Sequence, residues 1–281
     1  MRIYSVINDA LTVLYNELPQ FYQDRDAAIW EAIQRLTQRY ENLAAVNIDY
    51  NDAATKYAYL FKYAGSRACA VYSRHDIFAL ANLYAGTSLR HTSLGAGPGS
   101  DFLGVLKHFV QLGSQINLHV DLVDVDVTWR ATAGVVAAAA CNHLNGCPRP
   151  TGRFRQLDCS VANIAAELAP FQDSNLLTLS YLLSELPDGA ARRLLEAIFG
   201  VARRGTVVLV IDNNTEPVRQ LLTEAAQTVG LDVETCGAEV ITLRNENVEN
   251  MGLHYERFGD FNRNGFPHIV LDAFCFAATK R

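Results

Sequence analysis

The sequence lacks several patterns that would assign a function directly. Its six cysteines form no C-x-x-C pair, so their spacing indicates neither a zinc site nor a small disulfide framework. The longest apolar run, "ATAGVVAAAAC", is too short to span a membrane. Positive charge is not in excess, because the formal net charge is −6. These absences argue against a metal-stapled module, a membrane span and a surface that binds nucleic acid through charge alone.

The composition favours a soluble, cytoplasmic protein with no membrane partner. Apolar residues make up 49% of the 281 residues and charged residues 19%, which is enough material for a large packed core. The first segment, "MRIYSVINDALTVLYNELPQF", is interrupted by Asn8, Asp9 and Glu17 and so lacks the apolar core of a signal peptide. Most of the cysteines lie in apolar surroundings, as expected of thiols in a reducing compartment.

Apolar periodicity divides the chain into an N-terminal helical region, 1–88, and a second region, 89–281. The first region shows helical spacing throughout, and its last part, from "NDAATKYAYLF" onward, predicts two helices divided near Gly65-Ser66. The second region alternates short apolar runs with helical segments, which is typical of a parallel sheet with crossover helices. The expected strands are His91–Gly95, Asn117–Asp124, Arg153–Leu157, Asn175–Tyr181, Thr206–Asp212, Val240–Leu243 and His268–Ala277.

The expected helices of the second region are Asp101–Leu112, Thr128–Leu144, Val161–Leu168, Ala190–Val201 and Glu216–Val229. Asn264-Gly265 is a turn signal directly before the last strand, which favours an antiparallel pairing there. The prediction is therefore an α/β fold: a doubly wound, mostly parallel seven-stranded sheet with an antiparallel C-terminal strand, preceded by the helical region.

The stretch "SLGAGPGSDF" carries three glycines directly after the first expected strand. A P-loop would need a lysine after the glycines, where this chain has the acidic Asp101. The dinucleotide fingerprint would need a third glycine at Ser100. Both comparisons favour a ligand without phosphate, and a loop of bare backbone that approaches it closely.

This loop resembles motif I of class I S-adenosylmethionine-dependent methyltransferases, and the similarity extends over roughly residues 60 to 281. The resemblance implies S-adenosyl-L-methionine as the cofactor. Its first contacts would be Gly95, Ala96, Gly97, Pro98, Gly99 and Asp101. One departure concerns Ser93, which stands where the family commonly has an acidic residue.

Two acidic positions extend the resemblance. In "HVDLVDVDVTW", Asp124 matches the acid that binds the ribose hydroxyls, with Val125 beside it and Asp126 as the alternative. In "FRQLDCSVA", Asp158 and Cys159 match the residues that contact the adenine edge. Asp124 and Asp158 could instead cap the helices that follow them, a role that aspartate performs well.

The resemblance also nominates residues near the transferred methyl group. In "LLTLSYLLSELP" these are Ser180, Tyr181, Ser184 and Glu185, with Ser180 and Tyr181 also touching the cofactor. Tyr181 and Glu185 are the catalytic candidates of this segment. From the aromatic N-terminal cluster that includes Tyr59 and Arg67, we nominate Tyr72 and Arg74 for the cofactor and His75 as a catalytic base, with His254 as the alternative base. The competing interpretation is that these aromatics only pack on the sheet.

No subclass signature identifies the acceptor. The motif used for exocyclic amines is absent, and Asp212-Asn213 supplies only half of a catechol-type metal site, so we predict no metal. The predicted enzyme methylates an O or N nucleophile, and the acidic charge balance favours a small molecule over RNA. A catalytically silent scaffold is one alternative. A ribosomal RNA methyltransferase-like protein is another, because "SYLLSELPDGAARRLLEAIF" resembles ribosome-associated methyltransferases.

Overall fold

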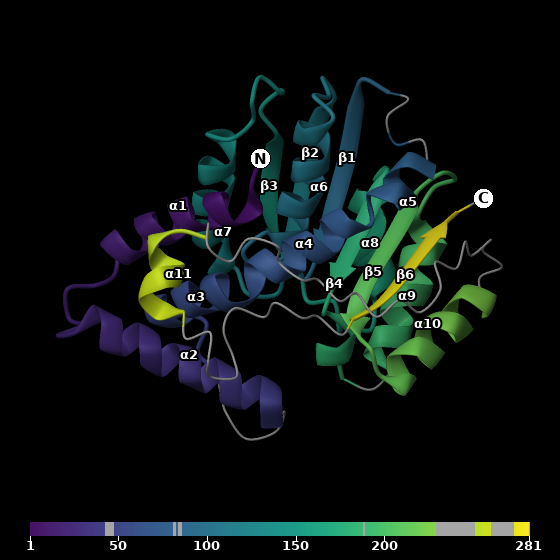
Figure 1. Ribbon diagram of the computed structural model, residues 1–281. Helices are drawn as coiled ribbons and strands as arrows, with labels where there is room; N and C mark the ends of the chain where they lie inside the picture. The colour runs from purple at the N-terminus through teal and green to yellow at the C-terminus, as the bar shows by residue number, and fades with distance from the viewer. Residues whose placement is uncertain are drawn as a thin grey trace.

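The protein contains a six-stranded sheet with helices on both faces (Figure 1). The computed structural model describes residues 1–42, 48–80, 83, 86–187, 189–228, 251–259 and 273–280, to which all structural statements below refer. The strands are β1 (Ser88–Leu94), β2 (Asn117–Asp124), β3 (Thr151–Gln156), β4 (Leu176–Ser180), β5 (Val207–Asn213) and β6 (Ala273–Thr279). Their spatial order is β3-β2-β1-β4-β5-β6.

All neighbouring strands pair in parallel except β6, which runs antiparallel to β5. The predicted mostly parallel sheet with an antiparallel C-terminal strand is thus confirmed for six strands. The seventh expected strand, Val240–Leu243, lies outside the described residues, as do the Asn264-Gly265 turn and residues 268–272 of the last expected strand.

Helices account for most of the remaining described residues. In the N-terminal region they are α1 (Ile3–Asn16), α2 (Arg25–Asn42), α3 (Ala53–Tyr59), the π-helix η1 (Leu60–Ala64), α4 (Gly65–Ser73) and α5 (His75–Leu80). In the sheet region they are α6 (Ser100–Gln111), α7 (Trp129–Cys141), α8 (Ile164–Leu168), α9 (Ala190–Val201), α10 (Glu216–Thr228) and α11 (Leu253–Phe258). Two short 3₁₀ turns complete the set, η2 (Ala169–Phe171) and η3 (Leu183–Glu185).

The period of two along each strand separates the core into two apolar layers. On β5, Val207, Leu209 and Ile211 join the cluster formed with the N-terminal helices, α6 and α7. Val208 and Val210 face the opposite way and pack with α8, α9 and α10. Successive side chains of a strand point to opposite faces, so a continuous apolar run is what a strand buried on both faces requires.

The N-terminal helices pack against the face of the sheet that carries Val207, Leu209 and Ile211. Helix α4 packs along α6, and α1 packs against α7 and α11. In Figure 1 the yellow helix α11 lies beside the purple α1, and the ring centroids of Tyr4 and Tyr255 are 5.4 Å apart. The predicted break at Gly65-Ser66 is wrong, because the chain stays helical from Ala53 to Ser73. Gly65 is instead a contact position, where a Cβ atom would lie 2.4 Å from the Tyr4 ring.

Candidate functional site at the carboxyl ends of the strands

The glycine loop joins β1 to α6 through three residues with left-handed backbone angles. The angle φ is +65° at Gly95, +47° at Gly97 and +90° at Gly99, which directly precedes α6. Glycine adopts these angles without steric cost, whereas other L residues do not. A Cβ atom at Gly95 would in addition lie 2.9 Å from Leu182 Cδ1. The loop therefore presents bare backbone to whatever occupies the space beside it.

A pocket of about 170 Å³ lies beside this loop, at the carboxyl ends of β1, β2 and β4. Open α/β sheets bind their ligands at this edge. The predicted site residues that line it are Gly95, Gly97, Asp124, Val125, Asp126, Asp158, Cys159, Ser180, Tyr181 and Glu185. Ala96, Pro98, Gly99 and Asp101 are buried within or beneath the loop rather than in the lining.

Asp124 and Asp126 both border the pocket, and their hydrogen bonds differ. The Gly97 N–H donates to Asp124 Oδ2 at 2.7 Å, and the Asp126 N–H donates to Asp124 Oδ1 at 3.0 Å. Asp126 Oδ1 accepts from the Thr128 N–H at 2.8 Å, directly before α7. Asp124 thus ties the end of β2 to the glycine loop, and each of its oxygens keeps a lone pair for another donor. Burial raises the pKa of the Asp124 carboxyl, in opposition to these backbone hydrogen bonds.

Asp158 and Cys159 lie at the end of β3 with different exposure. Asp158 is exposed, and its Oδ1 accepts from the Ser160 N–H at 2.8 Å and from Ser160 Oγ at 2.6 Å. Hydrogen bonds from Ser160 lower the pKa of Asp158. Cys159 is buried, and burial together with the nearby Asp124 and Asp158 carboxylates raises the pKa of its thiol to about 12. The thiol is therefore neutral and acts as an apolar surface of the pocket.

The segment after β4 is held in a conformation that points its side chains at the pocket. Tyr181 has φ of 56°, an uncommon value for a residue other than glycine, and its N–H donates to the Ile211 carbonyl at 2.7 Å. Asp212, fully buried at the end of β5, accepts from the Leu183 N–H at 2.8 Å and the Ser184 N–H at 3.3 Å. Asp212 therefore stabilises this loop, and its carboxylate is engaged with backbone. Strained angles of this kind occur where a site demands a particular side-chain direction.

Asp101 places a buried carboxyl group next to Ser93. Ser93 Oγ donates to Asp101 Oδ2 at 3.3 Å, and Asp101 is only 3% exposed. Burial raises the pKa of Asp101, while the neighbouring hydroxyls and the Arg67 guanidinium oppose that rise. Asp101, in the first turn of α6, thus places a buried carboxyl group beside Ser93 beneath the loop.

Helices α3 and α4 contribute a wall from members of the N-terminal aromatic cluster other than the nominated Tyr72 and Arg74. Tyr59 and Arg67 line the pocket together with Tyr50 and Trp129. The ring centroids of Tyr59 and Trp129 are 5.1 Å apart, and those of Tyr50 and Trp129 are 5.6 Å apart. The Arg67 guanidinium hydrogen-bonds to the Tyr59 hydroxyl and lies 4.7 Å from the centroid of the Tyr181 ring.

The π-helix η1 explains how these side chains share one face. Tyr59, Tyr63 and Arg67 are spaced by four residues across it, and the Arg67 guanidinium lies 5.3 Å and 5.5 Å from the Tyr59 and Tyr63 ring centroids. The wider turn of a π-helix offsets the rotation that four-residue steps accumulate on an α-helix. The four-residue spacing was the available signal in the sequence, although the π-helix itself was not predictable.

The structure does not bring Tyr72, Arg74 and His75 to the pocket, so their nomination is corrected. Helix α4 runs alongside α6, and Tyr72 reaches Gln111 at the end of α6 that is distant from the glycine loop. A helix of 12 residues is about 18 Å long, which separates that end from the site. The His75 ring stacks on Tyr72 at 5.8 Å, and Arg74 pairs with Asp76 at 3.0 Å.

The alternative base, His254, also lies elsewhere. Its Nδ1 hydrogen-bonds to the Tyr57 hydroxyl at 2.7 Å and its Nε2 to Thr12 Oγ1 at 3.0 Å. Burial lowers its pKa, so the ring is a neutral link between α1, α3 and α11. Within the described ranges, no three His, Cys, Asp or Glu side chains gather as a metal site would require. No helix in the same ranges has the length and apolarity needed to cross a membrane.

Comparisons with known proteins bear on the fold. No family model and no curated protein sequence matches this chain. Among solved structures, an O-methyltransferase family protein from Burkholderia thailandensis aligns with a TM-score of 0.52 at 12% identity, over 91% of this chain and 72% of that one. The CurJ carbon methyltransferase aligns with a TM-score of 0.51 at 11% identity, over 96% of this chain and 70% of the other. The chain therefore has the class I, Rossmann-like methyltransferase fold.

Proposed function

We propose that this chain is an S-adenosylmethionine-dependent methyltransferase that acts on an O or N nucleophile of a small molecule. The observation that carries the proposal is the hydrogen bond of 2.7 Å from the Gly97 N–H to Asp124 Oδ2. It joins the glycine loop to the acid at the end of β2 at the rim of one pocket, which is an arrangement that suits a ligand with a ribose. Three carboxylates, those of Asp124, Asp126 and Asp158, border the pocket and would repel the phosphates of a dinucleotide.

Each part of the pocket has a role in this proposal. Asp124 would accept hydrogen bonds from the ribose hydroxyls, with Asp126 as its neighbour, and Asp158 with Cys159 would border the adenine. Arg67 is the positive group that would pair with the donor's carboxylate, in place of the nominated Arg74. The bound cofactor would supply an electrophilic methyl group on a sulfonium.

The acceptor side would lie at Tyr181 and Glu185. The Tyr181 ring and the Glu185 carboxylate both border the pocket at the end of β4. Glu185 is exposed, so its carboxylate could accept a proton from the acceptor, while the rings of Tyr59, Trp129 and Tyr181 would exclude water. The net charge of −6 favours a small acceptor over RNA. A catalytically silent scaffold is the second candidate, because no histidine lines the pocket among the described residues.

Calorimetric titration with S-adenosylmethionine tests the cofactor. We expect wild type to bind it in preference to NAD, and Asp124→Ala to weaken binding by at least about tenfold, or 1.4 kcal/mol. Asp126→Ala is the matched control and should cost less, because the Asp126 carboxylate is engaged with the start of α7. Equal affinity of wild type and Asp124→Ala would contradict the proposal.

A turnover screen separates the enzyme from the scaffold. Purified protein is incubated with S-adenosylmethionine and pools of small-molecule alcohols, phenols and amines, and with ribosomal RNA. Formation of S-adenosylhomocysteine with a small-molecule pool would support the proposed acceptor class. Turnover with RNA alone would support the ribosomal alternative, and binding without turnover would support the scaffold.

A further inference from the structure

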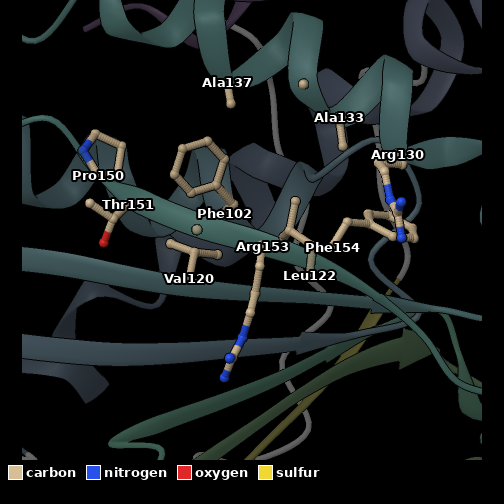
Figure 2. Close-up of a pocket in the computed structure, with 12 residues that line it drawn as sticks. Phe102, Val120, Leu122, Arg130, Ala133, Ala137, Pro150, Thr151, Arg153 and Phe154 are labelled. Carbon is tan, nitrogen blue, oxygen red and sulfur yellow. The ribbon is translucent and has the colours of Figure 1, made fainter.

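A second cavity, of about 250 Å³, lies between α7 and the strands β2 and β3 (Figure 2). Its floor is formed by Val120 and Leu122 of β2, which are 5% and 9% exposed, and by the Phe102 ring at 3%. Phe154 of β3 forms one end, and Pro150 lies toward the other end in Figure 2. The cavity is thus an apolar groove that opens to solvent beside Gly134 and Thr151, and it is separate from the glycine-loop pocket.

Helix α7 leaves this space open because, beyond Arg130 in its first turn, it presents only small residues to it. Ala133, Gly134 and Ala137 face the cavity, and a Cβ atom at Gly134 would meet nothing within 4 Å. Protein interiors are ordinarily close-packed, and leucine or isoleucine at these positions would fill the gap. Water in such an apolar space finds few hydrogen-bond partners. An apolar ligand that displaces this water would therefore be stabilised.

One end of the cavity carries a positive charge. The Arg130 guanidinium carbon lies 6.0 Å from the Phe154 ring centroid, and Figure 2 shows the two side chains together. Within the described ranges Arg130 makes no ion pair, whereas Arg153 hydrogen-bonds to Asp121. Arg153 and Phe154, adjacent on β3, point to opposite sheet faces, and Figure 2 shows Arg153 directed away from the cavity. Arg130 is thus the charge available to a ligand in the cavity.

We propose that this cavity is a second ligand site, for a small aromatic carboxylate whose ring lies between α7 and β2 and whose anionic group meets Arg130. The size fits this class, since an apolar cavity of about 150 Å³ already accepts benzene. A guanidinium binds carboxylate through paired hydrogen bonds, which supplies the polar half of the recognition. The proposal does not depend on which cofactor occupies the first pocket.

The two sites share structural elements. Leu122 lines the cavity and Asp124 lines the first pocket, about 7 Å apart along the same face of β2. Arg130 and Trp129, adjacent at the start of α7, likewise contribute one to each site. A carboxylate at Arg130 would therefore contact the helix end that also forms the wall of the first pocket.

Methyl-labelled NMR with 3-phenylpropionate tests the site. We expect saturable shifts at the methyl groups of Val120, Leu122, Ala133 and Ala137, all of which line the cavity. Ala137→Phe should abolish these shifts by filling the cavity. Ala138→Phe, the same change on the exposed side of α7, should leave them intact.

The contribution of Arg130 is measured against an uncharged probe. We expect wild type to bind 3-phenylpropionate about tenfold more tightly than 3-phenylpropanamide, and Arg130→Gln to remove this preference. Arg130 is exposed, so this variant is expected to fold even if Ala137→Phe does not. Absence of shifts at millimolar probe, shifts that persist in a folded Ala137→Phe variant, or equal affinity for acid and amide would each overturn the proposal.

Discussion

Arg67 is buried, only 9% exposed, yet its guanidinium borders the glycine-loop pocket between the rings of Tyr59 and Tyr181. A buried cation needs compensation, and aromatic faces supply part of it through cation–π attraction. The buried Asp101 carboxyl group also interacts electrostatically with Arg67, and the carboxylate of a ligand would add a further anionic partner. Arg67 is therefore the residue whose replacement best separates recognition of the donor's carboxylate from recognition of its nucleoside.

We predict that Arg67→Met weakens binding of S-adenosylmethionine by about tenfold or more, the cost of one charge-assisted pair. Binding of decarboxylated S-adenosylmethionine should change little, because that analogue lacks the group that Arg67 would hold. Calorimetry with both ligands measures the two effects. A parallel loss of affinity for both would show that Arg67 acts by packing alone.

His91 illustrates how burial couples a residue to pH. It is fully buried in β1, its Nε2 hydrogen-bonds to Thr178 Oγ1 at 2.9 Å, and burial lowers its pKa from 6.5 to about 3. Neutral His91 therefore favours the folded state above pH 6.5, and this contribution is lost as the pH falls. At pH 5 the loss amounts to about 2 kcal/mol relative to pH 7.5.

We predict that His91→Gln reduces the fall in the free energy of unfolding between pH 7.5 and pH 5, measured by urea titration. The glutamine Nε2 can keep the contact with Thr178, and the readout is the slope with pH rather than the absolute stability. Burial raises the pKa values of Asp101, Asp124 and Asp212, which changes the free energy of unfolding with pH in the opposite sense. This contribution is the same in wild type and in His91→Gln, so it cancels when the two slopes are compared. His119→Gln, at an exposed position of β2, is the control for the histidine-to-glutamine change itself.

At the scale of elements, the contact between α4 and α6 positions both Arg67 and the glycine loop. Gly104 of α6 permits this contact, because a Cβ atom there would lie 2.5 Å from the Ala68 carbonyl oxygen and 2.7 Å from Val71 Cβ. Gly134 of α7 is its opposite, with open space at the same position. The two helical glycines therefore form a matched pair, one required by packing and one not.

We predict opposite effects of alanine at these two glycines. Gly104→Ala should destabilise the protein by about 1–3 kcal/mol, because the backbone of α4 must move to relieve the overlap. Gly134→Ala should stabilise it by up to about 1 kcal/mol, the gain in helix propensity. Chemical denaturation measures both, and stabilisation by Gly104→Ala would contradict the packing described for α4 and α6.

At the scale of the molecule, the glycine-loop pocket has walls from both the helical layer and the sheet. Tyr59 and Arg67 belong to the N-terminal helices, whereas Asp124 ends β2 and Tyr181 directly follows β4. A ligand that contacts both parts should stabilise both parts together. At a concentration of 100 times Kd, the expected stabilisation is about 2.7 kcal/mol.

We predict that S-adenosylmethionine slows amide hydrogen exchange in residues 53–73 as well as in the glycine loop, 95–99. Contacts between the bound ligand and the side chains of Tyr59 and Arg67 would suppress local unfolding of the N-terminal helices. Exchange followed by mass spectrometry with NAD as the control ligand measures this. Protection confined to the glycine loop would show that the N-terminal helices do not contribute to the site.

The sequence alone was sufficient for what depends on local chain geometry. Apolar runs with a period of two or near four predicted the mostly parallel sheet, and the glycines after the first strand predicted the loop. The Asn264-Gly265 turn signal predicted the antiparallel last strand. The acids at the ends of β2 and β3 followed from the same pattern, since carboxyl ends of parallel strands share one edge.

Only the tertiary structure decided which distant side chains meet at that edge. The N-terminal nominees Tyr72, Arg74 and His75 lie toward the far end of α6, and Arg67 and Tyr59 take the place beside the loop. Asp101 places a buried carboxyl group beside Ser93, beneath the loop. Which residue of a helix reaches a pocket depends on how that helix packs along its neighbour, and a sequence of apolar positions does not specify this.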